Sequence, residues 1–152
     1  MGIDEIKHTV TAIILNDKNQ VLGVSRKDDH TDFGLIGGKV DDEDQREEFT
    51  GITYTTPLKK SLHKAIKREV KEETGLDIDT STMIELLSMP KHMVGETYWG
   101  HTFLIRDWSG EIGSDEPHVI KWTTFEELEK GCFGPWNTIT KDCLKAVGIN
   151  IK

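Results

Sequence analysis

The side chains best suited to chemistry lie in one short segment, REVKEETGL, at residues 68–76. Its glutamates Glu69, Glu72 and Glu73 stand at i, i+3 and i+4, so on a helix the three carboxylates share one face. Like charges at these spacings destabilise a helix by about 0.2–0.5 kcal/mol per pair. The segment is therefore either a solvated charged face that tolerates this cost or a site for a hard divalent cation, because Mg²⁺ prefers carboxylate, carbonyl and water oxygens.

A second segment, LIGGKV at residues 35–40, has the composition of a phosphate-handling turn. Two adjacent glycines, Gly37 and Gly38, let the backbone approach a ligand closely, and Lys39 follows them with a positive charge. Gly38 and Arg68 are separated by 29 residues, so the fold must bring the two segments together if they form one site.

The segment at 68–76 resembles the second half of the signature of the Nudix hydrolases, Arg-Glu-(aliphatic)-x-Glu-Glu-x-Gly-(aliphatic). At average residue usage such a match arises by chance roughly once in ten million start positions. FGLIGGKV at 33–40 resembles the strand and glycine turn that open the signature, with Ile36 where a proline is common. The resemblance implies the family's α/β/α sandwich with a mixed sheet, as a single domain over residues 1–152. The fixed positions of the second half are filled by Arg68, Glu69, Val70, Glu72, Glu73, Gly75 and Leu76.

The spacing between the two halves departs from the family pattern. The Nudix signature has 13 residues between its glycine and its arginine, whereas this chain has 29, which is an insertion of 16. Counting back from Arg68 puts Lys60 at the position of the signature glutamate, and counting forward from the glycine turn puts Asp44 there. Asp44 or its neighbour Glu43 is expected to replace that glutamate, with Arg68 as its partner. A lid, a homodimer contact and an inert surface loop all remain open as roles for the insertion at 44–56.

The resemblance implies Mg²⁺- or Mn²⁺-dependent hydrolysis of a nucleoside diphosphate linked to another moiety, with water attacking a phosphorus in line. Catalysis of this kind is mostly positioning and charge neutralisation, and bound metal ions acidify the attacking water. The general base is expected to be Glu69 on the helix or Glu116 in a later segment, where the alternative is a turn acid beside Pro117. By family correspondence the metal ligands are Glu69, Glu72, Glu73, Glu116 and a backbone carbonyl of Gly37 or Gly38, Arg68 supports catalysis, and Gly37 and Lys39 contact the phosphates.

Short family members often act on (deoxy)nucleoside triphosphates or oxidised purine nucleotides, and this is the substrate class expected here. In FGPWNTITKD, Asn137 is expected to hydrogen-bond the base, and Trp136 or Phe33 to stack on it. The plainer alternative is that Asn137 caps a helix and Trp136 fills the core. An ADP-ribose or other nucleotide-sugar pyrophosphatase is a second candidate, because Pro90 lies near the position of a proline in those members. A non-catalytic nucleotide-binding regulator is a third, although such a domain is expected to lose its helix carboxylates, and here they remain.

The sequence pattern predicts the elements that must position these residues. An apolar stripe at helical spacing predicts a helix that begins near Thr56 and Pro57 and ends at Gly75. β-rich runs at 9–16 and 20–27 predict a hairpin. The stripe consists of Leu58, Leu62, Ala65, Ile66 and Val70; further strands are expected at 33–40, 81–89, 97–105 and 118–122, and further helices at 123–130 and 137–147. This mixture of strands and helices indicates the α/β class.

The composition limits the partners and the location. The formal net charge of −8 argues against a duplex nucleic acid partner, because such binding requires Lys and Arg to neutralise phosphates. No apolar run approaches the roughly 20 residues that span a membrane, so no membrane partner is expected. The two cysteines, Cys132 and Cys143, form no disulfide framework. We therefore expect a cytoplasmic protein whose partner is a small nucleotide.

Overall fold

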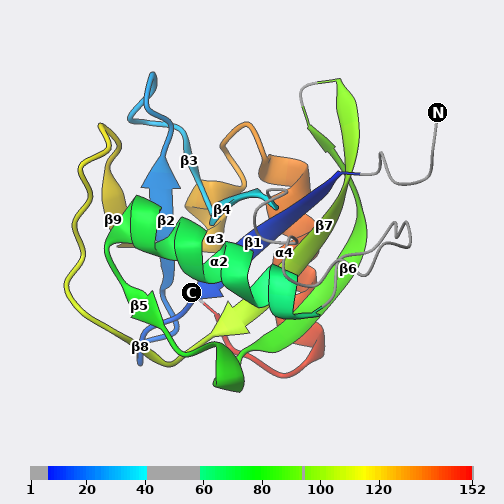
Figure 1. The fold of residues 1–152 in the computed structure, drawn as a ribbon. Helices are drawn as coiled ribbons and strands as arrows, with labels where there is room; N and C mark the ends of the chain where they lie inside the picture. The colour runs from blue at the N-terminus through cyan, green and yellow to red at the C-terminus, as the bar shows by residue number, and fades with distance from the viewer. Residues whose placement is uncertain (1–6, 41–58, 94, 152) are drawn as a thin grey trace.

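A four-stranded mixed sheet forms the centre of the fold (Figure 1). The computed structural model describes residues 7–40, 59–93 and 95–151. In the order of the sheet, the strands are β4 (Ile36–Lys39), β1 (His8–Ile14), β7 (Glu96–Ile105) and β6 (Ile84–Met93). β1 runs parallel to β7, and the other two pairs are antiparallel. Every residue of β1 is buried, as expected for a strand covered on both faces.

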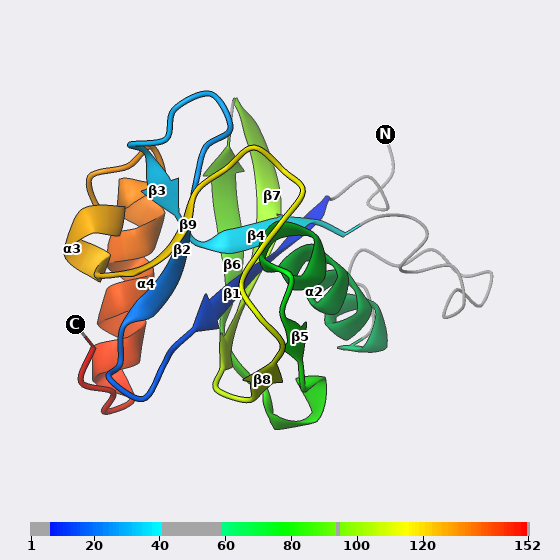
Figure 2. The same ribbon diagram turned by 90° about the vertical axis from the view of Figure 1, so that its left-hand side faces the viewer.

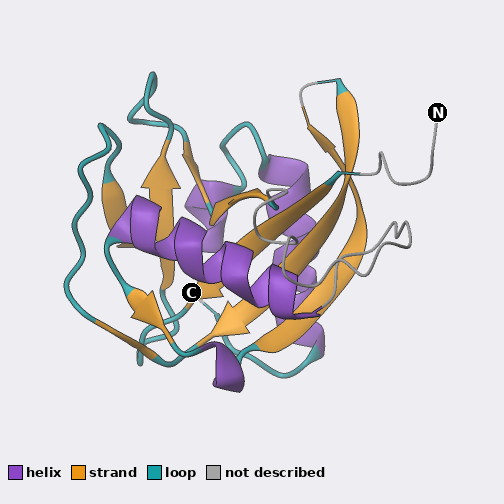
Figure 3. Ribbon diagram, viewed as in Figure 1, coloured by secondary structure: helices purple, strands orange, loops and turns teal. Residues whose placement is uncertain are grey.

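The remaining strands form two smaller sheets (Figure 3). β2 (Val21–Ser25) lies between β3 (Phe33–Gly34) and β9 (Ile120–Thr123), and both pairings are antiparallel. β5 (Asp77–Ile78) pairs with β8 (Trp108–Ser109). The expected hairpin between residues 9–16 and 20–27 is wrong, because β1 and β2 enter different sheets and share only an isolated bridge from Leu15 to Val21.

The helices cover the strands from opposite sides, which makes the fold an α/β/α sandwich with a mixed sheet (Figure 2). The long helix α2 (Lys59–Thr74) lies on one side, and α3 (Phe125–Leu128) and α4 (Gly134–Ala146) lie on the other. Gly75 ends α2 with a positive φ of 80°, as a glycine after a helix commonly does. α4 begins three residues before the expected 137, because Pro135 lies inside its first turn rather than ahead of it.

The core divides between the two faces of the sheet. On the α2 side, the stripe Leu62, Ala65, Ile66 and Val70 packs in one buried cluster with alternate residues of β1. On the other side, α3 and α4 pack in a second cluster that includes Ile13. Burying each large aliphatic side chain contributes about 1.5–3 kcal/mol, so packing on both faces holds β1 in place. β4 is held in turn because it pairs with β1. None of the described helices is both long and apolar enough to cross a membrane.

Candidate active site

The glycine turn and the glutamate helix meet directly in the structure. The carboxylate of Glu69 lies against the backbone of Gly38, so closely that a Cβ at this position would be 2.3 Å from the carboxyl carbon. The amide of Gly37 donates a hydrogen bond of 3.4 Å to Oε1 of Glu73. The guanidinium of Arg68 donates to the carbonyl of Lys39 at 3.3 Å. The segments that are 29 residues apart in the sequence therefore form one surface.

The alternation along β4 decides which backbone groups face α2. The amide of Val40 donates to the carbonyl of His8, so the backbone groups of Val40 and Gly38 are turned toward β1. Those of Gly37 and Lys39 point to the other edge of β4, where Glu73 and Arg68 bind them. The expected ligand carbonyl was Gly37 or Gly38, and this geometry favours Gly37.

The pKa of Glu73 is strongly perturbed. Burial raises the pKa of its carboxyl to about 8, and the nearby charges of Glu69 and Glu116 add to this effect. The hydrogen bond from the Gly37 amide lowers the pKa of Glu73 and so partly offsets this rise. A carboxyl group whose pKa is raised into the neutral pH range is typical of functional sites, because burial and neighbouring like charges shift pKa values there.

Glu72 and Arg68 occupy the outer part of the same face. The side chain of Glu72 is exposed, and its carboxylate lies 3.9 Å from the guanidinium of Arg68. Arg68 also forms a salt bridge of 2.8 Å with Glu69. Because it reaches both carboxylates and the Lys39 carbonyl, Arg68 holds β4 and α2 in register.

The expected general base Glu116 is connected to α2 by His118, which contacts both of them. The sequence pattern assigned no role to this histidine. Glu116 lies in the loop before β9, 3.3 Å from Lys27 and 3.4 Å from Nδ1 of His118. The Nε2 of His118 lies 2.6 Å from the carbonyl oxygen of Glu73, with the side chain only 3% exposed. A carbonyl only accepts, so Nε2 carries the proton and Nδ1 faces Glu116. His118 thus ties the end of α2 to the loop that carries Glu116.

The donor set of this surface fits a divalent cation. The atoms are carboxylate and carbonyl oxygens, which Mg²⁺ and Mn²⁺ prefer, and the mutual repulsion of Glu69, Glu73 and Glu116 is of the kind that a cation relieves. In the described residues, no three His, Cys, Asp or Glu side chains already converge on a common metal position. Glu69 and Glu73, with Glu116 beside them, are the residues that would hold the ion, and Glu72 would join from the outer face.

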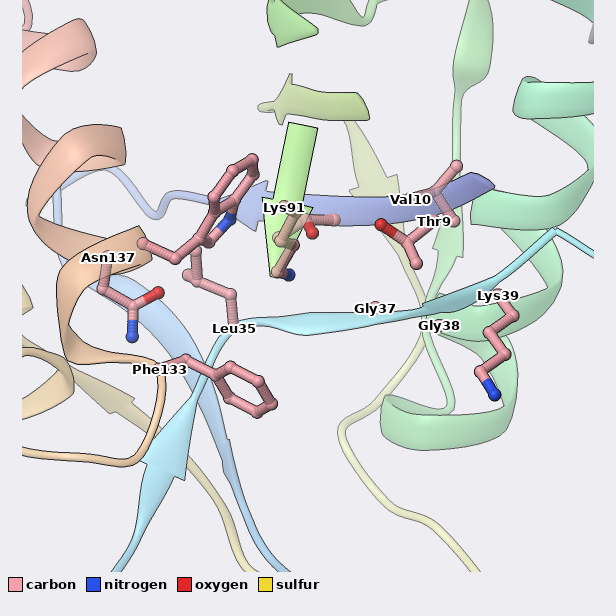
Figure 4. Close-up of a pocket in the computed structure, with 11 residues that line it drawn as sticks. Thr9, Val10, Leu35, Gly37, Gly38, Lys39, Lys91, Phe133 and Asn137 are labelled. Carbon is pink, nitrogen blue, oxygen red and sulfur yellow. The ribbon is translucent and has the colours of Figure 1, made fainter. Parts of the chain in front are cut away.

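A cavity of about 230 Å³ opens on the other side of β4 (Figure 4). Its walls include Gly37, Gly38 and Lys39 of β4, together with the start of α4. Trp136 and Asn137, both expected at a base, line it. Asn137 does not cap the helix with its side chain, since its amide donates to the carbonyl of Leu128 at 3.1 Å.

The aromatic residue at the cavity is not the expected Phe33. Phe33 is 5% exposed and packs in the second core cluster, and it is not among the residues that line the cavity. Phe133, which had no expected role, lines it instead. Pro90, the basis of the ADP-ribose alternative, is exposed on β6. The expected replacements Asp44 and Glu43, and the whole insertion, lie outside the described residues, as does the side chain of Lys60.

Comparisons with known proteins concern the family and the fold. A family model described as the NUDIX domain matches residues 6–141. No curated protein matches the chain significantly. Among solved structures, the fold is similar to the E. coli ORF135 protein, with 22% identity over 94% of this chain and 93% of that chain and a TM-score of 0.66.

Two MutT structures are similar to the same extent. MutT from Methanosarcina mazei has 18% identity over 95% of this chain and 96% of its own, with a TM-score of 0.65. A MutT from a study of Aliivibrio salmonicida and Vibrio cholerae has 19% identity over 93% and 99%, with a TM-score of 0.63. These likenesses show a shared fold, and the family match extends over most of the sequence. The chain therefore belongs to the Nudix hydrolase family, whose general reaction is the hydrolysis of nucleotide pyrophosphate linkages.

Proposed function

We propose that this Nudix hydrolase cleaves the pyrophosphate linkage of a (deoxy)nucleoside triphosphate or an oxidised purine nucleotide, with Mg²⁺ or Mn²⁺ bound at the glutamate face of α2. One observation supports this most directly: the carboxylates of Glu69 and Glu73 lie against the paired glycines of β4. The cavity on the opposite side of the same strand has room for part of a ligand, about 230 Å³.

The residues of the site have different proposed roles. Gly37 and Gly38 leave the strand open to a phosphate because they carry no side chain, and the amine of Lys39 adds positive charge near it. Divalent ions, when bound, neutralise phosphate charge and acidify water. Glu116 is the candidate general base beyond the helix, held by Lys27 and His118. Arg68 is a positioning residue, because it contacts Glu69 and the backbone of β4.

Hydrolysis of a nucleotide panel with Mg²⁺ tests the proposal. We expect the wild type to turn over at least one (deoxy)nucleoside triphosphate, and Glu72→Gln and Glu73→Gln to lose that activity, since each removes a carboxyl group, and so a potential ligand oxygen, from the proposed metal face. Glu111→Gln is the matched control, because Glu111 is exposed in the loop at 110–113. Turnover of ADP-ribose alone would identify the nucleotide-sugar alternative. Binding without turnover on any substrate would identify a regulator and refute the enzyme proposal.

A further inference from the structure

The cavity beside β4 has aromatic side chains in its walls. Its walls include the rings of Phe133 and Trp136. Trp136 is 8% exposed and rests on Gly100 of β7, where an added Cβ would be 3.0 Å from the indole ring. The volume of about 230 Å³ is smaller than the roughly 300–1,000 Å³ typical of sites for whole ligands. The cavity is therefore the size of one moiety of a nucleotide rather than of a whole nucleotide.

Lys91 brings a cation into this apolar space. It lies on β6, and its side chain points into the group of residues that lines the cavity (Figure 4). Its amine lies 4.7 Å from the ring centroid of Trp136 and 5.4 Å from that of Phe133. Over residues 7–40, 59–93 and 95–151, Lys91 has no hydrogen bond and no salt bridge of its side chain. Burial lowers the pKa of Lys91 to about 8. The faces of the two rings attract the cation but offer its N–H groups no hydrogen-bond acceptor, so a ligand oxygen in the cavity would supply one.

The neighbouring polar residue cannot substitute for this donor. Asn137 is 1% exposed, and its Nδ2 is committed to the carbonyl of Leu128. Because a carbonyl oxygen only accepts, the atom of Asn137 that faces it is Nδ2, and Oδ1 is the atom left for other partners. The indole Nε1 of Trp136 and the hydroxyl of Thr9 also line the cavity without a hydrogen-bond partner. Lys91 is the charged donor that lies over the two rings on which a ligand ring would pack.

We propose that Lys91 is the residue that selects the base: the cavity takes a nucleobase with a carbonyl oxygen at position 6 of a purine or position 4 of a pyrimidine, which accepts a hydrogen bond from the Lys91 amine while the ring packs on Phe133 and Trp136. This inference rests on the proposed function, in that the ligand is a nucleotide. Guanine presents O6 and N7 as acceptors and uracil or thymine presents O4, whereas the corresponding groups of adenine and cytosine are amino donors. A buried donor opposite an amino group is left unpaired, which costs affinity.

Affinities of nucleoside monophosphates test the inference without relying on turnover. Calorimetry with GMP, UMP, AMP and CMP is expected to show about tenfold tighter binding of GMP and UMP, whose bases carry O6 or O4 in place of an amino group, by the wild type. In Lys91→Met, which keeps the unbranched stem, GMP and UMP are expected to weaken to the level of AMP and CMP. Lys130→Met is the matched control, because Lys130 is exposed at the end of α3. It is expected to keep the preference.

A second measurement uses the wild type alone and does not depend on the folding of a variant. Acetylation of Lys91, followed by mass spectrometry, is expected to slow in the presence of GMP and to be little affected by AMP at the same concentration. The inference is overturned if the wild type prefers AMP and CMP, shows no preference, or binds none of the four. It is also overturned if Lys91→Met lowers all four affinities equally. Failure of the proposed function gives a different result, namely selective binding of nucleotides without hydrolysis.

Discussion

Gly38→Ala is expected to abolish most of the activity while leaving the fold intact. A Cβ at residue 38 would be 2.3–2.6 Å from the three carboxyl atoms of Glu69 and would approach no other group as closely. Contacts of a real Cβ essentially never fall below 3.0 Å, so the carboxyl carbon must move by at least 0.7 Å. Glu69 can make this movement because its carboxylate is the end of a flexible side chain. The substitution therefore selectively displaces the carboxylate of Glu69, a proposed metal ligand.

The size of the effect follows from that displacement. A misplacement of about 1 Å in a reacting or positioning group costs on the order of 100-fold in rate, so we expect kcat to fall about 100-fold. The free energy of unfolding should stay within about 1 kcal/mol of the wild-type value, because Gly→Ala substitutions at compatible backbone angles change it by about 0.4–1 kcal/mol, and φ of Gly38 is not positive.

Steady-state hydrolysis with Mg²⁺ and urea unfolding measure the two quantities. Gly34→Ala is the matched control on a neighbouring strand, since its Cβ would meet only Phe133 at 3.8 Å; it should retain kcat. Gly37→Ala is the opposite case, because its Cβ would be 2.4 Å from the backbone oxygen of Val10, and it should lose stability. Full activity of Gly38→Ala would refute the role given to the contact between Glu69 and Gly38.

Three further predictions concern stability. Burial raises the pKa of Glu73 from 4.5 to about 8, so the folded chain holds a proton that the unfolded chain releases. Without divalent cations, the free energy of unfolding should therefore fall as pH rises from about 5 to about 8. Urea unfolding across this range measures the fall, which Glu73→Gln should remove; a flat profile for the wild type would contradict the assignment. His118→Ala leaves the Glu73 carbonyl without its donor and should cost about 1–3 kcal/mol by urea unfolding, with exposed His92→Ala as the control; equal unfolding midpoints would contradict it. Gly75→Ala should cost more than Gly148→Ala in thermal melting. Both glycines have positive φ, but only at residue 75 would a Cβ be 2.4 Å from the oxygen of Gly113; equal losses would show that the close approach does not matter.

Local patterns predicted the helix of the site well. The stripe Leu62, Ala65, Ile66 and Val70 repeats at helical spacing, and these residues are buried on one side of α2. The end at Gly75 followed from its freedom to adopt positive φ. Periodicity and end signals are local, and here the tertiary structure agrees with them.

Long-range pairing was beyond the reach of such patterns. The runs at 9–16 and 20–27 look like a hairpin because a short polar turn joins them, yet β1 pairs with β4 and β7. Each residue of β1 is buried, and a strand covered on both faces gains more from the centre of a sheet than from an edge. Strand neighbours of this kind are decided by burial over the whole chain, which no window of sequence contains.

In the site, too, local patterns were predicted and long-range contacts were not. The glutamates of α2 were visible because three carboxylates on one face are unusual, and the Nudix resemblance assigned them roles that remain predictions. Lys91 and His118 gave no signal, since a single lysine in a strand normally extends its amine to water and a lone histidine has no spacing to read. Their environment comes from Trp136 and from the end of α2, which lie far away in the sequence.

The position of β4 between two sites has a consequence for the length of a substrate. Its residues Gly37 and Gly38 border the glutamates of α2 on one side and the cavity on the other. For a molecule that binds at the glutamates and in the cavity at once, the width of this strand sets the distance between the bond to be cleaved and the ring. Compounds with the same ring and the same phosphates but a longer or shorter spacer would then be rejected by reach alone, whatever their chemical groups.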